Sequence, residues 1–362
     1  MTVSYLGAAA DTTAIDAAIR DFFTERRAEA DALGPDFAAT VAELESFVLR
    51  GGKRIRPAFA WLGWIGAGGD PGDPVAPAVL SACAGFELLH ASGLIHDDII
   101  DDSRTRRGHP AAHVTYAERH RGRRFSGDSN SYGVGTAILI GDLALIWADV
   151  LVRASGLPIE AHARVSPVWS AVRSEVMYGQ LLDLISQVSD DEDVERAMRV
   201  IRYKTASYTV ERPLQFGAAI AGADADLVAA YQAFGADIGI AFQLRDDLLG
   251  VFGDPLVTGK PSGDDLREGK RTVLIATALR LADEHDPTAA AFVRSKLGTD
   301  LSDDDLDRFR AILVGLGAVE DVERQIAQRA DQALAVLEAS SATSPAKHQL
   351  ADMAIKATQR AQ

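Results

Sequence analysis

The segment 76–100 constrains the fold most strongly, because it is long and apolar around much of its circumference. A helix with this pattern has to be buried on most sides by other helices. Ala, Leu, Glu and Arg dominate the rest of the chain, and alternating Val, Ile, Thr and Tyr runs bounded by turns are scarce. The sequence therefore predicts an all-α fold built as one large helical bundle.

Apolar periodicity predicts eight further helices, and the breaks between them are loops and not interdomain linkers. We expect these helices at about 39–49, 133–154, 165–186, 194–221, 225–251, 272–283, 303–315 and 319–339. The breaks fall at 66–77, 121–131, 189–193 and 254–269. We therefore predict a single domain over 1–362, with its core at about 40–340 and with 1–20 and 345–362 at the periphery.

The charge balance narrows the classes of partner. The chain has 37 basic and 52 acidic residues, a formal net charge of −15, which argues against nucleic acid and against broad adhesion to anionic membranes. The most apolar stretch, 133–152, is interrupted by Asp142 and Asp149, so we predict no membrane span. A lone cysteine, Cys83, excludes an internal disulfide framework and is compatible with the cytoplasmic location that we predict.

Four aspartates appear where the apolar helix 76–100 ends, in the run HDDIIDD (96–102). Asp97 and Asp101 are spaced i,i+4, so they share one helix face and repel each other. A buried carboxylate needs a cationic partner, and oxygen ligands with vacant positions suit Mg²⁺. The alternative is an acidic helix end that faces solvent. A second acid pair, Asp246-Asp247, also interrupts an apolar helix, and two such pairs facing each other would suit a metal-bound polyphosphate.

Clusters of basic residues accompany both acid pairs. Each base taken alone is typical of a solvated surface cation, but together they predict local binding of an anionic ligand. The segment GGKRIRP (51–57) places three cations at the start of a helix, where free backbone N–H groups also attract anions. Further cations near the acid pairs are Arg104, Arg106, Arg107, Lys204, Lys260 and Lys270.

These motifs resemble those of the trans-prenyl diphosphate synthases, the polyprenyl synthetase family. The resemblance runs from about residue 44 to 270 and rests on GGKRIRP (51–57), FELLHASGLIHDDIIDDSRTRRG (86–108), GDLAL (141–145), GQLLD (179–183), KTASYTVERP (204–213), FQLRDD (242–247) and GKPSGDDLREGKRT (259–272). It implies the isoprenoid synthase fold, an all-α bundle around a central cavity, usually as a homodimer. It also implies condensation of isopentenyl diphosphate with an allylic diphosphate (dimethylallyl, geranyl or farnesyl).

The resemblance also implies roles for individual residues. Asp97 and Asp101 would hold two Mg²⁺ ions with support from Asp98, and Asp246 would hold a third. The isopentenyl diphosphate would be gripped by Lys53, Arg56, His90 and Arg107. The allylic diphosphate would be contacted by Arg106, Lys204, Lys260 and Lys270. The reaction centre would be lined by Gln180, Asp183, Thr205 and Gln243.

One position departs from the family pattern. Many members carry a third aspartate in the second motif, where this chain has Gly250. Asp254 lies four residues further on and could compensate, or the ligand could be absent. Because Asp246 is retained, we expect activity to survive. The property that the glycine would affect is the affinity for the third metal.

Two small residues, Ser92 and Gly93, stand one turn before the first aspartate, where short-chain members of the family place a bulky aromatic floor. On a helix they face the cavity below the metals, so a C15 product is disfavoured. Trp147, Met177 or Tyr178 could limit the depth instead, or could be ordinary core or interface residues. We predict the C20 product, geranylgeranyl diphosphate, with C25 or longer as the alternative. A terpene cyclase and a non-catalytic partner subunit are the less favoured alternatives on the same fold.

Overall fold

The computed structural model describes residues 12–189, 191–254 and 262–359. Within these ranges the chain is helical apart from a small antiparallel hairpin in which Thr105 pairs with Pro110, as predicted for an all-α fold. The elements are α1 (Thr12–Leu33), α2 (Pro35–Leu49), α3 (Ile55–Gly66), α4 (Ala76–Ile100), β1 (Thr105–Arg106), β2 (His109–Pro110), α5 (Ala112–Gly122), α6 (Ser129–Arg153), α7 (Ile159–Val188), α8 (Val194–Val200), η1 (Ile201–Glu211), α9 (Arg212–Ala221), α10 (Ala225–Phe252), α12 (Asp264–Arg267), α13 (Val273–His285), α14 (Pro287–Lys296), α15 (Asp303–Gly315), α16 (Ala318–Ala339) and α17 (Ser344–Thr358).

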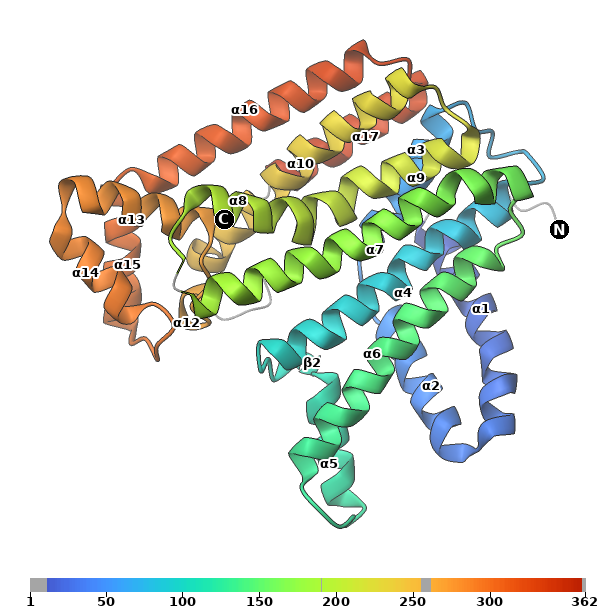
Figure 1. Cartoon of the computed structure of the whole chain (residues 1–362), viewed down its shortest axis with the longest axis horizontal. Coiled ribbons are helices and arrows are strands. Elements are labelled where there is room, and N and C mark those ends of the chain that lie inside the picture. Colours follow the sequence, from blue (N-terminus) through green and yellow to red (C-terminus); the bar gives the residue numbers. More distant parts are fainter. Residues whose placement is uncertain (1–11, 190, 255–261, 360–362) are drawn as a thin grey trace.

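Helix α4 has the predicted bounds and lies inside the bundle, between α6, α3 and α1 (Figure 1). Its apolar residues are buried from Val79 to Ala91, which explains why no polar stripe interrupts them. Toward its end the helix alternates between residues that are buried, such as Ile95 and Asp98, and half-buried ones such as Gly93 and Asp97, and it ends at Ile100. The acidic residues at the C-terminal end of α4 therefore lie at least partly inside the bundle.

The predicted helix 194–221 is continuous, but its middle part, η1, is a π-helix. The wider turn lies against α7 at Gly179, where a β-carbon would stand 2.2 Å from the backbone nitrogen of Lys204. Only glycine permits this approach. Because π-turns shift the faces on which residues lie, η1 directs Lys204, Thr205 and Tyr208 into one cavity.

Helices α1 and α17 pack into the core, so the described parts of the segments expected at the periphery, 12–20 and 345–359, contribute buried residues. Ile15 and Ile19 of α1 are fully buried, and Ala346 and Leu350 of α17 are buried as well. The reason is an apolar stripe at helical spacing on each helix. The stripes are short and polar residues separate their apolar positions, so the sequence pattern alone did not predict that these helices are buried.

Three described helices, α4, α6 and α10, are long and apolar enough to cross a membrane by length and composition alone. In the fold, 72% of the apolar window of α4 is buried, against 50% for α10 and 39% for α6. Helix α6 therefore leaves an apolar face uncovered, with Ile138, Leu139 and Ile146 exposed.

Candidate active site

A cavity of about 300 Å³ opens between α4, α7, η1 and α10. It collects most of the residues singled out from the sequence, although they come from distant parts of the chain. The predicted residues that line it are Arg56, His90, Gly93, Asp97, Arg106, Gln180, Asp183, Lys204, Thr205, Gln243, Asp246 and Lys270. The two acid motifs therefore face one space, as their positions on separate apolar helices predicted.

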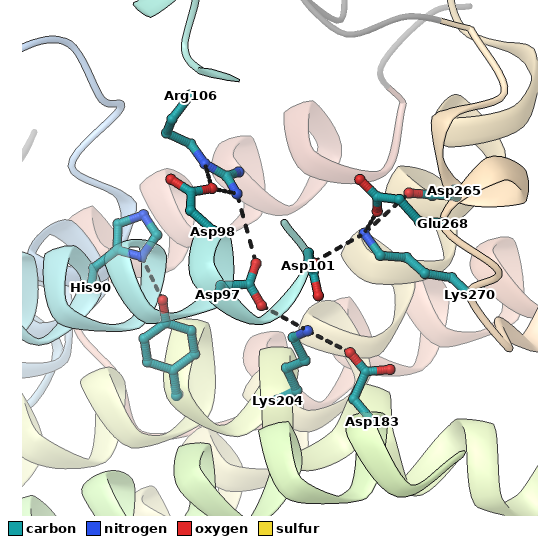
Figure 2. Close-up of polar contacts among 11 residues, drawn as sticks. His90, Asp97, Asp98, Asp101, Arg106, Asp183, Lys204, Asp265, Glu268 and Lys270 are labelled. Atoms are coloured by element: carbon teal, nitrogen blue, oxygen red, sulfur yellow. Dashed lines mark hydrogen bonds and ion pairs between the residues drawn. The ribbon is translucent and has the colours of Figure 1, made fainter. Parts of the chain in front are cut away.

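Asp97 of the first motif is bound by lysine and arginine side chains (Figure 2). Its Oδ1 lies 3.2 Å from Nζ of Lys204, which also lies 2.6 Å from Oδ2 of Asp183. Arg106 approaches the other oxygen of Asp97 at 3.8 Å. Burial works against ionisation of Asp97, but the charges of Lys204, Lys270 and Arg106 outweigh it and lower the pKa of Asp97. Asp97 is therefore ionised, and it is paired with the cationic side chains of Lys204 and Arg106.

Asp98 and Asp101 have different surroundings from Asp97. Asp98 is fully buried and accepts hydrogen bonds from Arg106, whose Nε lies 2.8 Å from Oδ1. It therefore orients Arg106. The side chain of Asp101 is largely buried, and its Oδ2 lies 4.0 Å from Nζ of Lys270. Burial and the charge of Asp97 raise the pKa of Asp101 to about 6.

Lys270 lies at the centre of an acidic group that closes the far side of the cavity (Figure 2). Its Nζ is 2.6 Å from Glu268 and 3.4 Å from Asp265, besides its contact with Asp101. Burial opposes its charge, but Asp265 and Glu268 raise the pKa of Lys270 well above its ordinary value. Sequence reasoning missed Asp265 and Glu268, although both lie in the motif that contains Lys270.

In the second motif, Asp246 and Asp247 differ in environment and in role. Asp246 is exposed to the cavity, whereas Asp247 is buried and accepts a hydrogen bond of 2.7 Å from Nε2 of Gln243. The Oε1 atom of Gln243 in turn accepts from the hydroxyl of Thr205 at 2.8 Å. Burial and the charge of Asp265 raise the pKa of Asp247 well above its usual range. Asp247 thus fixes the orientation of Gln243, and Asp246 is the group that faces a ligand.

The other end of the cavity is formed by His90, Tyr208 and Arg56. Nδ1 of His90 lies 2.6 Å from the hydroxyl of Tyr208, and the guanidinium of Arg56 lies 4.0 Å from the centre of the Tyr208 ring. Burial and the neighbouring arginines lower the pKa of His90 well below its ordinary value, so the imidazole is neutral. Tyr208 was missed, although it follows Lys204 by one turn within KTASYTVERP.

Six predicted residues are not among the described residues that line the cavity, namely Lys53, Ser92, Asp98, Asp101, Arg107 and Trp147. Lys53 is exposed on the loop before α3, and Arg107 donates to the carbonyl of Arg50 at 3.3 Å. Trp147 packs edge-on against Phe22 and Phe23 of α1, each at 5.9 Å between ring centres. Lys260 lies outside the described residues.

The donor set fits Mg²⁺. The described residues contain no group of three or more His, Cys, Asp or Glu side chains converging as a finished cage, and Mg²⁺ commonly takes one or two carboxylates, several waters and substrate phosphates. Asp97, Asp101 and Asp246 offer such carboxylates. Burial, and after it the charge of Asp97, raises the pKa of Asp101, so a cation placed between these two carboxylates would favour their ionised forms.

Residues 39–308 match the polyprenyl synthetase family. The crystal structure of geranylgeranyl pyrophosphate synthase from Corynebacterium glutamicum, complexed with isoprenyl diphosphate and magnesium, superposes with a TM-score of 0.92 at 45% identity, covering 96% of this chain and 98% of that one. The geranylfarnesyl diphosphate synthase of Aeropyrum pernix is 34% identical over 75% of this chain and 79% of its own length. The geranylgeranyl diphosphate synthase of Mycobacterium tuberculosis is 33% identical over 70% of this chain and 67% of its own length.

Proposed function

The chain belongs to the polyprenyl synthetase family and is a trans-prenyl diphosphate synthase, and we propose that it forms the C20 product geranylgeranyl diphosphate. The observation that carries the two-substrate reaction is the cavity into which both acid motifs project, with Arg106, Lys204 and Lys270 at one end and Arg56 at the other. A reaction between two diphosphate esters requires this arrangement, because both anions have to be neutralised side by side.

The allylic diphosphate is assigned to the end of the cavity formed by Arg106, Lys204 and Lys270. Magnesium bound at Asp97, Asp101 and Asp246 would supply further positive charge to the departing diphosphate. The allylic C–O bond breaks, its electron pair leaves with the diphosphate, and the cations stabilise the charge that develops there. Lys204 and Lys270 are already held at this end by Asp183 and Glu268.

Isopentenyl diphosphate is assigned to Lys53, Arg56, His90 and Arg107. In the neutral tautomer that accepts the Tyr208 hydroxyl proton at Nδ1, His90 carries its hydrogen on Nε2 and can donate it to a phosphate oxygen. The double bond of isopentenyl diphosphate attacks the allylic cation and forms a new carbon–carbon bond. A proton then leaves the carbon next to the resulting cation, and the departed diphosphate can accept it.

The proposed chain length rests on the residues below the first motif. Gly93 lines the cavity, and a β-carbon built on it meets no atom within 4 Å, so no bulky group restricts the chain at this turn. This openness disfavours a C15 product. The resemblance to a geranylgeranyl synthase at 45% identity favours C20, whereas the geranylfarnesyl synthase among the relatives supports C25 as the competing product.

We also propose that the protein is a cytoplasmic homodimer. Helices α6 and α7 each contribute exposed apolar surface, with Leu139 69% exposed and Leu181 53% exposed. A second copy that covers this surface would remove it from water. Light scattering coupled to size-exclusion chromatography tests the dimer, and Leu139→Glu should shift it toward monomer.

The product is tested by mass spectrometry after incubation with farnesyl diphosphate, isopentenyl diphosphate and Mg²⁺. A C20 product supports the proposal, and C25 or longer replaces it with a longer-chain synthase. Release of diphosphate from the allylic substrate without isopentenyl diphosphate would indicate a cyclase. No condensation by folded protein with dimethylallyl, geranyl and farnesyl primers would indicate a non-catalytic subunit.

A further inference from the structure

Arg54 is buried although it stands in a glycine-rich loop, directly before α3. Its side chain is 2% exposed, and its backbone is left-handed, with φ 50° and ψ 35°. Residues other than glycine rarely adopt this conformation, and a buried guanidinium is unfavourable unless it is paired. Specific contacts must therefore hold Arg54 in place.

Two carboxylates from different helices hold it. Nε of Arg54 donates to Oδ1 of Asp16 at 2.6 Å, and Nη1 donates to Oε2 of Glu87 at 2.7 Å. Asp16 belongs to α1 and Glu87 to α4. The guanidinium therefore fastens the loop before α3 to both helices, at a point one turn before His90 on α4.

The loop rests directly on this guanidinium. A β-carbon at Gly52, where φ is 106°, would lie 3.0 Å from Nη1 of Arg54 and 3.5 Å from Nη1 of Arg107. Arg107 also donates to the carbonyl of Arg50. The backbone that carries Lys53 is thus held between two guanidinium groups.

We propose that Arg54 is a positioning residue for isopentenyl diphosphate, which acts by holding Lys53 and Arg56 at the distance and angle that the diphosphate requires. The inference rests on the function proposed above. Arg54 itself points away from the substrate, toward Asp16 and Glu87, so it contributes no direct contact. It also makes α1, outside the family match at 39–308, a structural support of the substrate site.

The test has to separate positioning from folding, because Arg54→Met alone leaves Glu87 buried and unpaired, which destabilises a fold strongly. The informative variant is therefore Arg54→Met combined with Glu87→Leu, which removes both buried charges at similar volume. Arg54→Lys is the conservative variant, and Arg20→Met, which removes an exposed arginine from α1, is the matched control.

Binding is measured by isothermal titration with isopentenyl diphosphate alone, which cannot condense without an allylic partner. Steady-state kinetics then give KM separately for isopentenyl diphosphate and for farnesyl diphosphate. We expect the double variant to keep its helical circular dichroism and its Tm within a few degrees. We expect its Kd and KM for isopentenyl diphosphate to rise about tenfold or more, because small misplacements of binding groups have large effects.

The KM for farnesyl diphosphate should change less than about threefold, since Lys204 and Lys270 are held by other carboxylates. Arg54→Lys should lie between the wild type and the double variant, and Arg20→Met should match the wild type. A folded double variant with wild-type affinity for isopentenyl diphosphate overturns the inference. An equal rise in KM for isopentenyl diphosphate and for farnesyl diphosphate overturns it as well. Absence of both binding and condensation in the wild-type protein would instead refute the proposed function.

Discussion

The carboxylate of Asp265 occupies the space that a side chain at position 250 would need. A β-carbon built on Gly250 would lie 2.0 Å from Oδ2 of Asp265 and 2.7 Å from its Cγ. The contact is supported by the backbone, because Gly263 N donates to the carbonyl of Gly250 at 3.0 Å. Gly250, which stands where many family members have the third aspartate of the second motif, therefore leaves room for the carboxylate of Asp265 from α12.

This relationship predicts that restoring the aspartate harms the enzyme. Gly250→Asp should displace Asp265 and disturb its 3.4 Å contact with Lys270, so we expect KM for the allylic diphosphate to rise about tenfold, in line with the loss of an ion-pair partner. Adding Asp265→Gly to this variant should recover most of the loss. Kinetics across a Mg²⁺ titration provide the measurement, and higher activity in the single variant would contradict the prediction.

Asp97→Asn should lower kcat by about 10²–10³, because it removes the charge that faces the departing diphosphate while keeping the side-chain shape. Lys204 retains Asp183 as a partner in this variant, so the fold should survive. The matched control is Asp102→Asn, an exposed position with φ 49° that asparagine tolerates. Near-normal turnover of Asp97→Asn would remove Asp97 from the site.

Lys53→Ala should mainly raise KM for isopentenyl diphosphate, by about tenfold, as expected for the loss of one charge-assisted contact to phosphate. Lys53 lies on the loop held by Arg54, away from Lys204 and Lys270, so KM for the allylic diphosphate should stay near its wild-type value. Lys356→Ala, at an exposed position in α17, serves as the control. An effect confined to the allylic substrate would overturn the assignment of the two subsites.

The sequence predicted most of the helices and the two acid motifs, because both depend on local pattern. Helices α4 and α15 have the predicted bounds, and Asp97 and Asp246 line one cavity as expected. The π-turns of η1 could not be foreseen, since the composition of 201–211 is that of an ordinary helix. They depend on the close approach at Gly179, which is a contact between distant segments.

The site residues that were missed share this dependence on distant contacts. Tyr208 acts through His90, and Asp265 acts through Gly250 and Lys270. Asp265 and Lys270 do share one motif, but no spacing within the chain links Tyr208 to His90 or Asp265 to Gly250, because only the fold brings η1 to α4 and α12 to α10. Trp147 shows the opposite case. It was one of three residues that could have limited the depth of the cavity, but it packs against Phe22 and Phe23 of α1.

Gly93→Phe should shorten the product by at least one C5 unit. The position faces the cavity, and its β-carbon would meet no atom within 4 Å, so the ring can enter the chain pocket without overpacking the helix. Replacing a helical glycine with phenylalanine should also leave stability unchanged or higher, by up to about 0.5 kcal/mol. Gly315→Phe, with equally open surroundings far from the site, is the control. An unchanged product from a folded Gly93→Phe enzyme would place the floor elsewhere.

The neutral state of His90 predicts how the free energy of unfolding depends on pH. Burial and the positive charges of four arginines lower its pKa well below 6.5; the arginines, in decreasing order of effect, are Arg56, Arg107, Arg106 and Arg54. The unfolded chain therefore binds this proton more readily than the folded chain does, so the free energy of unfolding should fall as the pH drops below about 6.5. In His90→Gln this contribution is absent. The excess in free energy of unfolding of the wild-type protein over His90→Gln should therefore shrink as the pH falls, with a slope of up to about 1.4 kcal/mol per pH unit. Urea unfolding between pH 5 and pH 7.5 measures it, and parallel curves would show that His90 titrates in the folded protein as it does in the unfolded chain.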